Sequence, residues 1–106
     1  MSSEFIYVVR PTRPEMLSSG TTEIEDEVIG RHFRYVQALV REGRALVVGR
    51  TLTEGDETFG LVIFRADDLA SAIALAEADP AVVHGVMRVE VHPFKVVLLS
   101  DTWSTS

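Results

Sequence analysis

His32 occupies a position in a predicted helix where an apolar side chain normally stands. Within residues 24–43, apolar residues recur at the spacing of one helical face, and His32 falls near the middle of that face. An imidazole that points inward needs a hydrogen-bond partner, and it can exchange a proton near neutral pH. His32 is therefore either a candidate general base or a core histidine that bonds a backbone carbonyl. The apolar residues around it are Ile24, Val28, Ile29, Phe33, Tyr35, Val36, Leu39 and Val40.

Asp79 is the second candidate, because it stands immediately before Pro80 at the predicted end of the second helix. A proline restricts the backbone of the residue before it, so the carboxylate is held in a defined place. Taken alone, Asp79 is explained as a helix-stop residue that bonds its own loop. Beside His32, it would fix the imidazole tautomer and strengthen the ring as a general base. The spacing of the two residues does not decide whether they meet.

Composition sets the limits within which these residues can act. The chain has 106 residues, 46% of them hydrophobic, which suits one domain spanning residues 1–106. Its net charge is −6 with scattered basic residues, so we expect no nucleic-acid partner. No apolar run is long enough to span a bilayer and the first residues lack a signal-peptide pattern, which predicts a cytoplasmic protein with no membrane contact.

The residue types also limit the available chemistry to side-chain oxygen and imidazole groups. There are no cysteines, which excludes disulfides, thiolate nucleophiles and thiolate metal sites. The other two histidines, His84 and His92, lack the spacing and neighbours of a metal site, and we expect them at the surface. We therefore expect no metal and no cofactor.

The elements that must position His32 and Asp79 follow from periodicity and from the turn residues. They alternate as β-α-β-β-α-β, which is the order of a ferredoxin-like α+β sandwich with two helices on one face of an antiparallel sheet. Residues 94–99 could add a short fifth strand, and the polar tail from about residue 100 is predicted to be flexible. The predicted strands are 4–10, 44–49, 58–64 and 85–91, and the predicted helices are 24–43 and 68–79.

The segment 11–23 is the longest predicted loop. It holds two prolines, Gly20 and several serines and threonines, which predicts an irregular and mobile backbone. Loops of this length often cover a functional site. At its end, Thr22 and Glu25 have the spacing of a capping box, so the first helix is expected to begin there.

Two of the predicted strands are apolar on both faces. In 4–10 and 58–64 the side chains do not alternate between apolar and polar, as they would beside water. Two helices cover only one face of the sheet, so the second face needs another cover. A second copy of the chain related by twofold symmetry is the simplest one, and we predict a homodimer formed through this face.

Three stretches together resemble the YciI family, also called the YCII-related domain family: 31–49, which holds His32, 76–80, which holds Asp79-Pro80, and 85–94. The resemblance implies a small, dimeric, ferredoxin-like protein in which His32 and Asp79 form the active-site pair. The resemblance thus implies that His32 and Asp79 are in contact, which their spacing alone leaves open. The chain departs from the family in two places: Gly49 is followed by Arg50, where proline is common, and the loop 11–23 is long.

The resemblance also implies an activity: cofactor-independent proton transfer or elimination on a small organic substrate, as by a lyase or an isomerase. His32 would abstract the proton, and Asp79 would orient the His32 imidazole. Arg10 or Arg50 would hold an anionic group of the substrate. Gly49 and Phe94 are further candidates at the substrate site. The alternative is a dimeric module that binds a small ligand, or serves an accessory role, without catalysis. A relative of the antibiotic-biosynthesis monooxygenases would share the fold, but their distinguishing residues are not evident.

Overall fold

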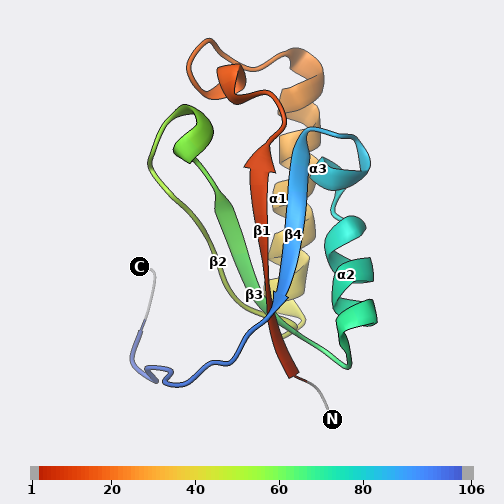
Figure 1. Cartoon of the computed structure of the whole chain (residues 1–106), viewed down its shortest axis with the longest axis vertical. Helices are drawn as coiled ribbons and strands as arrows, with labels where there is room; N and C mark the ends of the chain where they lie inside the picture. Colours follow the sequence, from red (N-terminus) through yellow and green to blue (C-terminus); the bar gives the residue numbers. More distant parts are fainter. Residues whose placement is uncertain (1–2, 104–106) are drawn as a thin grey trace.

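The computed structural model describes residues 3–103 and consists of one antiparallel sheet with helices on one side (Figure 1). The four strands lie in the order β2-β3-β1-β4, and β1 is paired on both sides. This is the predicted α+β architecture with the βαββαβ order. The strands are β1 (Ser3–Pro11), β2 (Ala45–Arg50), β3 (Gly60–Ala66) and β4 (Met87–Pro93).

The helices begin and end where local chemistry favours it. Thr22 and Glu25 form the predicted capping box at the start of α1, in which each side chain bonds the other's backbone N–H. Asp68 caps α2 by accepting from the Ser71 N–H. The helices are α1 (Glu23–Arg41), α2 (Leu69–Glu77) and the short α3 (Pro80–Val83), and two 3-10 segments are η1 (Pro14–Leu17) and η2 (Gly55–Glu57).

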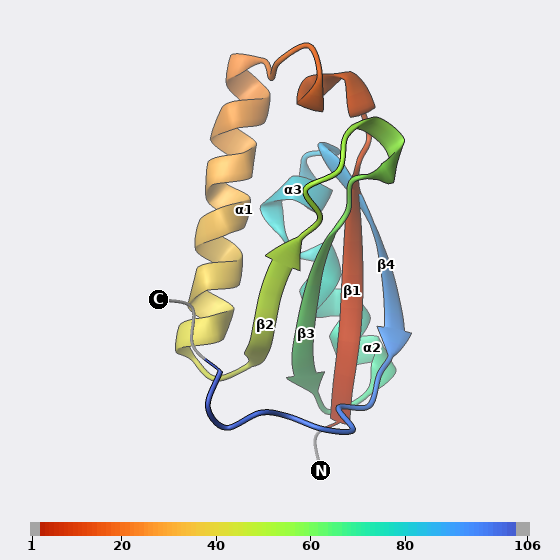
Figure 2. The same ribbon diagram turned by 90° about the vertical axis from the view of Figure 1, so that its left-hand side faces the viewer.

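The core lies between the helices and one face of the sheet. Alternate residues of β1, namely Phe5, Tyr7 and Val9, are buried, as period-two side-chain geometry requires. The Tyr7 ring packs edge-on against Phe64 of β3 with centroids 5.6 Å apart. Figure 2 shows α1 along this side of the sheet, with α2 behind the strands and α3 between α1 and β1 in this view.

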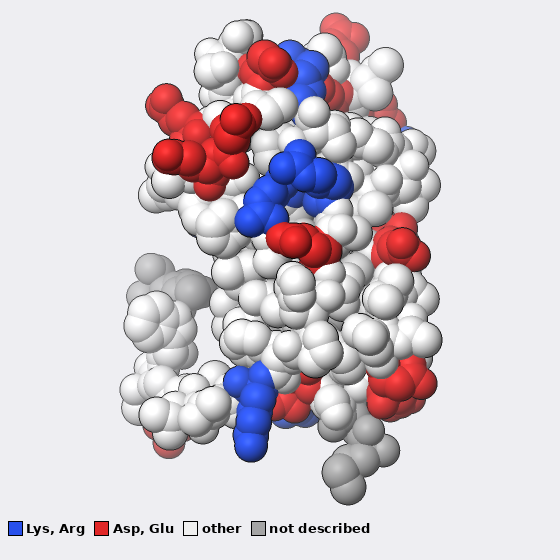
Figure 3. Space-filling view, in the orientation of Figure 1, with Lys and Arg blue, Asp and Glu red and all other residues white. Residues whose placement is uncertain are grey.

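The opposite face of the sheet, here called the open face, carries no helix. Its β1 and β3 side chains Ile6, Val8, Leu61 and Ile63 are only partly buried in the single chain. Figure 3 views this face, with a basic cluster over the upper half of the sheet, an acidic group at its lower edge and uncharged surface below that. The doubly apolar strands predicted from the sequence are therefore present, whereas the dimer remains a prediction.

The second helix ends earlier than predicted. It was expected to run to Asp79, but α2 ends at Glu77 and Asp79 instead caps α3, where it accepts from the Ala81 N–H at 2.9 Å. Pro80 is the physical reason, since proline keeps the residue before it out of helical geometry and itself fits the first position of a new helix.

The predicted fifth strand does not form, and the four-stranded sheet ends at Pro93. Pro93 already lies opposite Phe5, close to the start of β1, so little of β1 is left to pair with. Phe94 makes one last bond to the Glu4 carbonyl, and residues 94–99 then run on without regular structure. The predicted flexible tail is also irregular over residues 100–103, and residues 104–106 lie outside the described part of the chain.

The loop 11–23 is more structured than predicted. It contains η1, and Met16 is buried against Val28 and Ala81. Arg13 bonds Glu25 through two nitrogens and also donates to the Gly20 carbonyl at 3.1 Å. The composition of the loop does not predict these contacts, because only two of its side chains, Met16 and Arg13, make them. Mobility of the loop stays a prediction.

None of the helices within residues 3–103 combines the length and the apolar character needed to cross a lipid bilayer.

Candidate active site

His32 and Asp79 meet between α1 and the junction of α2 with α3. The imidazole Nδ1 lies 2.7 Å from Oδ2 and 2.9 Å from Oδ1 of the carboxylate. The Asp79 side chain is completely buried and that of His32 is 16% exposed. The contact expected between these two residues, which are far apart in the sequence, is therefore present.

The Asp79 carboxylate is surrounded by hydrogen-bond donors. Besides His32, the Tyr7 hydroxyl donates to Oδ2 at 2.9 Å and the Ala81 N–H donates to Oδ1 at 2.9 Å. A carboxylate that only accepts requires the proton of the imidazole to sit on Nδ1. This tautomer follows from the hydrogen-bond pattern, and it leaves Nε2 of a neutral His32 with a lone pair. Nε2 has no partner within the described residues.

Tyr7 lies beneath the Asp79 carboxylate in the core and donates a hydrogen bond to it. Its hydroxyl is fully buried, and burial together with the neighbouring Asp79 carboxylate raises the pKa of Tyr7 far above its usual range. The phenol therefore stays protonated and donates at any ordinary pH. Sequence reasoning missed Tyr7, although a tyrosine on the buried face of a strand is a signal that its hydroxyl needs a partner.

A cavity of about 430 Å³ lies beside His32. One wall is α1, which contributes Ile29, His32 and Phe33, and the opposite wall is the pair of strands β2 and β3 with the turn between them. Met16 and Leu17 of η1 close one side. The loop 11–23 thus forms part of the cavity wall, in the position expected of a cover over the site.

The lining of the cavity is mainly apolar. Of the lining residues in the described part of the chain, Arg50 alone carries a formal charge when His32 is neutral. Thr58 is buried, and its hydroxyl already donates to the Thr53 carbonyl. The His32 ring and the Arg50 guanidinium are therefore the groups best suited to recognise a polar or anionic part of a ligand.

The remaining predicted site residues divide into two groups. Gly49 and Arg50 line the cavity, as expected. Arg10 does not: its side chain pairs with Glu90 of the adjacent strand β4, on the open face. Its guanidinium also lies 5.5 Å from the centre of the Phe59 ring. Alternation along β1 puts Arg10 on the face away from the buried residues, so its predicted role as an anion holder is not supported.

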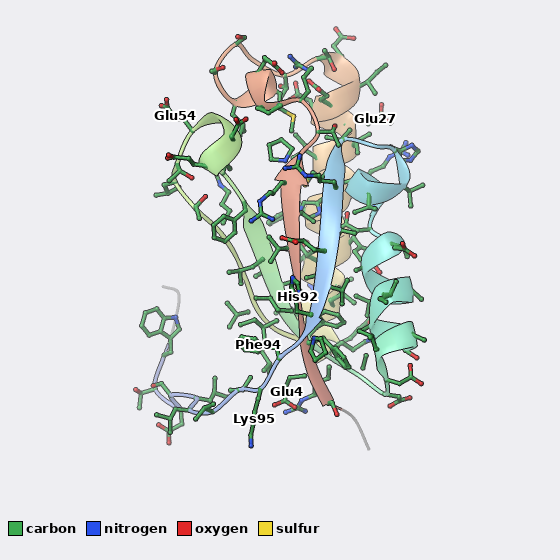
Figure 4. All side chains as sticks on the ribbon, in the orientation of Figure 1. Glu4, Glu27, Glu54, His92, Phe94 and Lys95 are labelled. Carbon is green, nitrogen blue, oxygen red and sulfur yellow. The ribbon has the colours of Figure 1, made fainter. Side chains whose placement is uncertain are left out.

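Phe94 also lies outside the cavity. Figure 4 shows it beside Glu4 at one end of the sheet, whereas Glu54, in the turn between β2 and β3, lies at the other end. Residues on both sides of that turn line the cavity, and Phe94 is not among them. Phe94 follows the end of β4 that lies away from this cavity, so its role at the substrate site stays a prediction.

A solved structure of similar fold was found by comparison. 5-Chloro-2-hydroxyhydroquinone dehydrochlorinase from Burkholderia phenoliruptrix, in complex with 2,5-dihydroxybenzoquinone, superposes with a TM-score of 0.62. The two proteins are 22% identical, and the alignment covers 86% of this chain and 93% of that one. No curated protein matches the chain in sequence. The model of the YCII-related domain matches residues 5–95, which is most of the chain. The chain therefore belongs to the YCII-related domain family.

Proposed function

We propose that this protein is a cofactor-independent enzyme in which His32 accepts a proton from a small organic substrate held in the cavity. The observation that carries the proposal is the bond of Nδ1 to a fully buried carboxylate, on a ring that also lines the cavity. Because the Nδ1 edge faces Asp79, the edge with Nε2 is left to border the cavity. That is the arrangement of a general base with its orienting group.

The chemistry divides between the two residues. Nε2 takes the proton from an acidic C–H or O–H of the substrate, and the imidazolium is stabilised by the Asp79 carboxylate on its other side. In an elimination, the electrons of the broken C–H bond form a double bond and the leaving group departs with its own electron pair. In an isomerisation, the imidazolium returns the proton to another atom of the substrate. A lyase or isomerase activity is thus the expected class.

The cavity favours a compact, mainly apolar substrate with one acidic or anionic group. A volume of about 430 Å³ suits a single substituted ring, and Arg50 supplies a cation for a phenolate or carboxylate. The dehydrochlorinase of similar fold was solved with a dihydroxybenzoquinone, which supports ring compounds of this kind as the first to test.

The functional unit is proposed to be a homodimer that buries the open face. Ile6 and Val8 of β1 and Leu61 and Ile63 of β3 would lie in the interface. This face is on the other side of the sheet from the helices, so pairing through it leaves the helix side of His32 accessible to small molecules.

The proposal is tested by screening hydroxylated and halogenated aromatics and lactones for turnover. His32→Ala and Asp79→Asn are expected to lower kcat/KM at least 100-fold, the usual contribution of a positioned general base. His84→Ala is the matched control, because His84 is exposed at the end of α3. Activity retained in His32→Ala would contradict the proposal. Ligands that bind in the cavity and are recovered unchanged would instead favour the non-catalytic binding module.

A further inference from the structure

We infer that Tyr7 is a positioning residue whose hydroxyl, by donating to Asp79, limits how strongly the carboxylate holds a proton on His32. The inference deepens the proposed function and rests on it for its meaning in catalysis. Its physical content, a coupling of Tyr7 to the His32 titration, is a property of the free protein and is measured without substrate.

The first observation is that Tyr7 and His32 share one oxygen atom. Oδ2 of Asp79 lies 2.9 Å from the Tyr7 hydroxyl oxygen and 2.7 Å from His32 Nδ1. Two donors on one oxygen draw on the same negative charge, so each weakens the bond to the other. The Ala81 N–H donates to Oδ1, which is also within 2.9 Å of Nδ1. Tyr7 is thus the one side-chain donor besides His32 on this carboxylate in the described chain.

The second observation is that the Tyr7 ring has no freedom to turn away. Tyr7 is fully buried in β1, where it lies between Val62 of β3 and Val91 of β4. The ring also packs edge-on against Phe64 at an interplanar angle of 76°. Since a buried hydroxyl without a partner is costly, the bond to Asp79 is maintained as long as the core is packed. The donor is therefore present in every protonation state of His32.

The consequence concerns the proton on Nε2. A carboxylate with fewer donors is a stronger partner for a positive imidazolium, which would keep His32 protonated to higher pH. A general base must be unprotonated at the working pH. By taking part of the Asp79 charge, Tyr7 lets Asp79 orient the ring while Nε2 remains available as a base.

The other groups that face His32 do not provide the same coupling. On α1 itself, the Tyr35 hydroxyl donates to the Leu75 carbonyl at 2.6 Å and makes no bond to Asp79. From the β2 and β3 side, Arg50 lines the same cavity and acts through space on the substrate side of the ring. From β4 the neighbouring cavity residue is Met87, which is neutral. Tyr35 is therefore a suitable control for the loss of one buried phenol hydroxyl.

The experiment compares Tyr7→Phe and Tyr35→Phe with the unmodified protein by following the His32 ring proton in NMR as a function of pH. In Tyr7→Phe the titration midpoint is expected to move to higher pH by about half a unit to one unit, the equivalent of one hydrogen bond of ordinary net strength. In Tyr35→Phe it should stay in place. Where a substrate is in hand, the acidic limb of the pH profile of kcat/KM should move by the same amount.

A second variant keeps the fold and changes only the strength of the donor. The chain has two tyrosines, so fluorotyrosine incorporated in the Tyr35→Phe background labels Tyr7 alone. Its more acidic hydroxyl is a stronger donor, and the His32 midpoint is expected to move to lower pH. If the midpoint moves in neither variant, Tyr7 is only a core residue and the inference is overturned. Failure of the proposed function is a separate result: turnover would then be unaffected by His32→Ala.

Discussion

Asp79 is the residue on which the site depends, because its buried carboxylate is the common acceptor for three donors. Tyr7, His32 and the Ala81 N–H come from β1, α1 and α3, three elements far apart in the sequence. The Asp-Pro step ends one helix and begins the next, and this holds the carboxylate in place. The same residue therefore stabilises the fold and orients the histidine.

Asp79→Asn is expected to lower the free energy of unfolding by about 1–3 kcal/mol, the cost of leaving one buried donor without an acceptor. The amide NH2 replaces an accepting oxygen and must face another donor at 0% exposure. Urea unfolding at pH 7 measures the loss. Asp56→Asn, at an exposed position in η2, is the control and should change the free energy of unfolding little. Equal stability of the two variants would contradict this account of Asp79.

Sequence reasoning found the two principal site residues but not the whole site. His32 was identifiable because it interrupts an apolar helical face, and Asp79 because it precedes a proline. Their contact could not be derived from spacing, since packing of separate elements decides it, and the family resemblance supplied it. Tyr7 was not predicted, because a strand pattern does not show which buried side chain meets a distant carboxylate. Arg10 lies on the open face of β1 and Phe94 follows the end of β4, so neither lines the cavity, and their role at the substrate site stays a prediction.

Among the elements, the segment before α1 is joined to that helix by an ion pair. Arg13 bonds Glu25, which is also the acceptor in the capping box of α1, so one carboxylate joins the loop to the helix. The hydrogen bond from Arg13 lowers the pKa of Glu25 to about 2. The anchored loop brings Met16 and Leu17 to the cavity.

This ion pair predicts a dependence of stability on pH. Because the Glu25 pKa is lower in the folded protein than its ordinary value of 4.5, the stabilisation is complete above about 4.5 and is lost as pH falls toward 2. Glu25→Gln retains a side chain suited to the capping box but removes the charge. Between about pH 5 and about pH 2, the free energy of unfolding measured in urea should fall less steeply for Glu25→Gln than for the unmodified protein. Parallel curves would contradict the prediction.

The elements themselves were largely predictable. Periodicity and capping residues gave every strand and both long helices to within a few residues, since these signals are local. The prediction of a fifth strand was wrong, because a strand forms only where a sheet edge is free to pair with it. The apolar sequence 94–99 does not show whether such an edge is available. The η1 segment was not predicted for a similar reason: burial of the single side chain Met16 depends on packing against residues distant in the sequence.

At the scale of the whole molecule, one face of the sheet and the C-terminal segment present apolar side chains to solvent in the single chain. Leu98 is 92% exposed and Trp103 is 83% exposed, and Figures 1 and 2 show this segment crossing the lower end of the sheet. Such surfaces are typical of an interface between subunits. They are consistent with the proposed homodimer.

Light scattering is expected to give a mass about twice the 11.7 kDa of the chain. Ile63→Lys places a charge on the open face opposite Ile6 and should convert the protein to a monomer. Val83→Lys is the control, because Val83 is exposed on α3 and away from that face. A monomeric unmodified protein at micromolar concentration would rule out this interface.

In the proposed mechanism, Asp79 holds the proton of His32 on Nδ1 and leaves Nε2 as the base. Long-range nitrogen-proton NMR of protein labelled with ¹⁵N-histidine tests it most directly, because the two ring nitrogens give different shifts when protonated and when not. In the neutral imidazole we predict a protonated Nδ1 and an unprotonated Nε2. A proton on Nε2 with Nδ1 bare would contradict it, because Nε2 would then have no lone pair to offer a substrate.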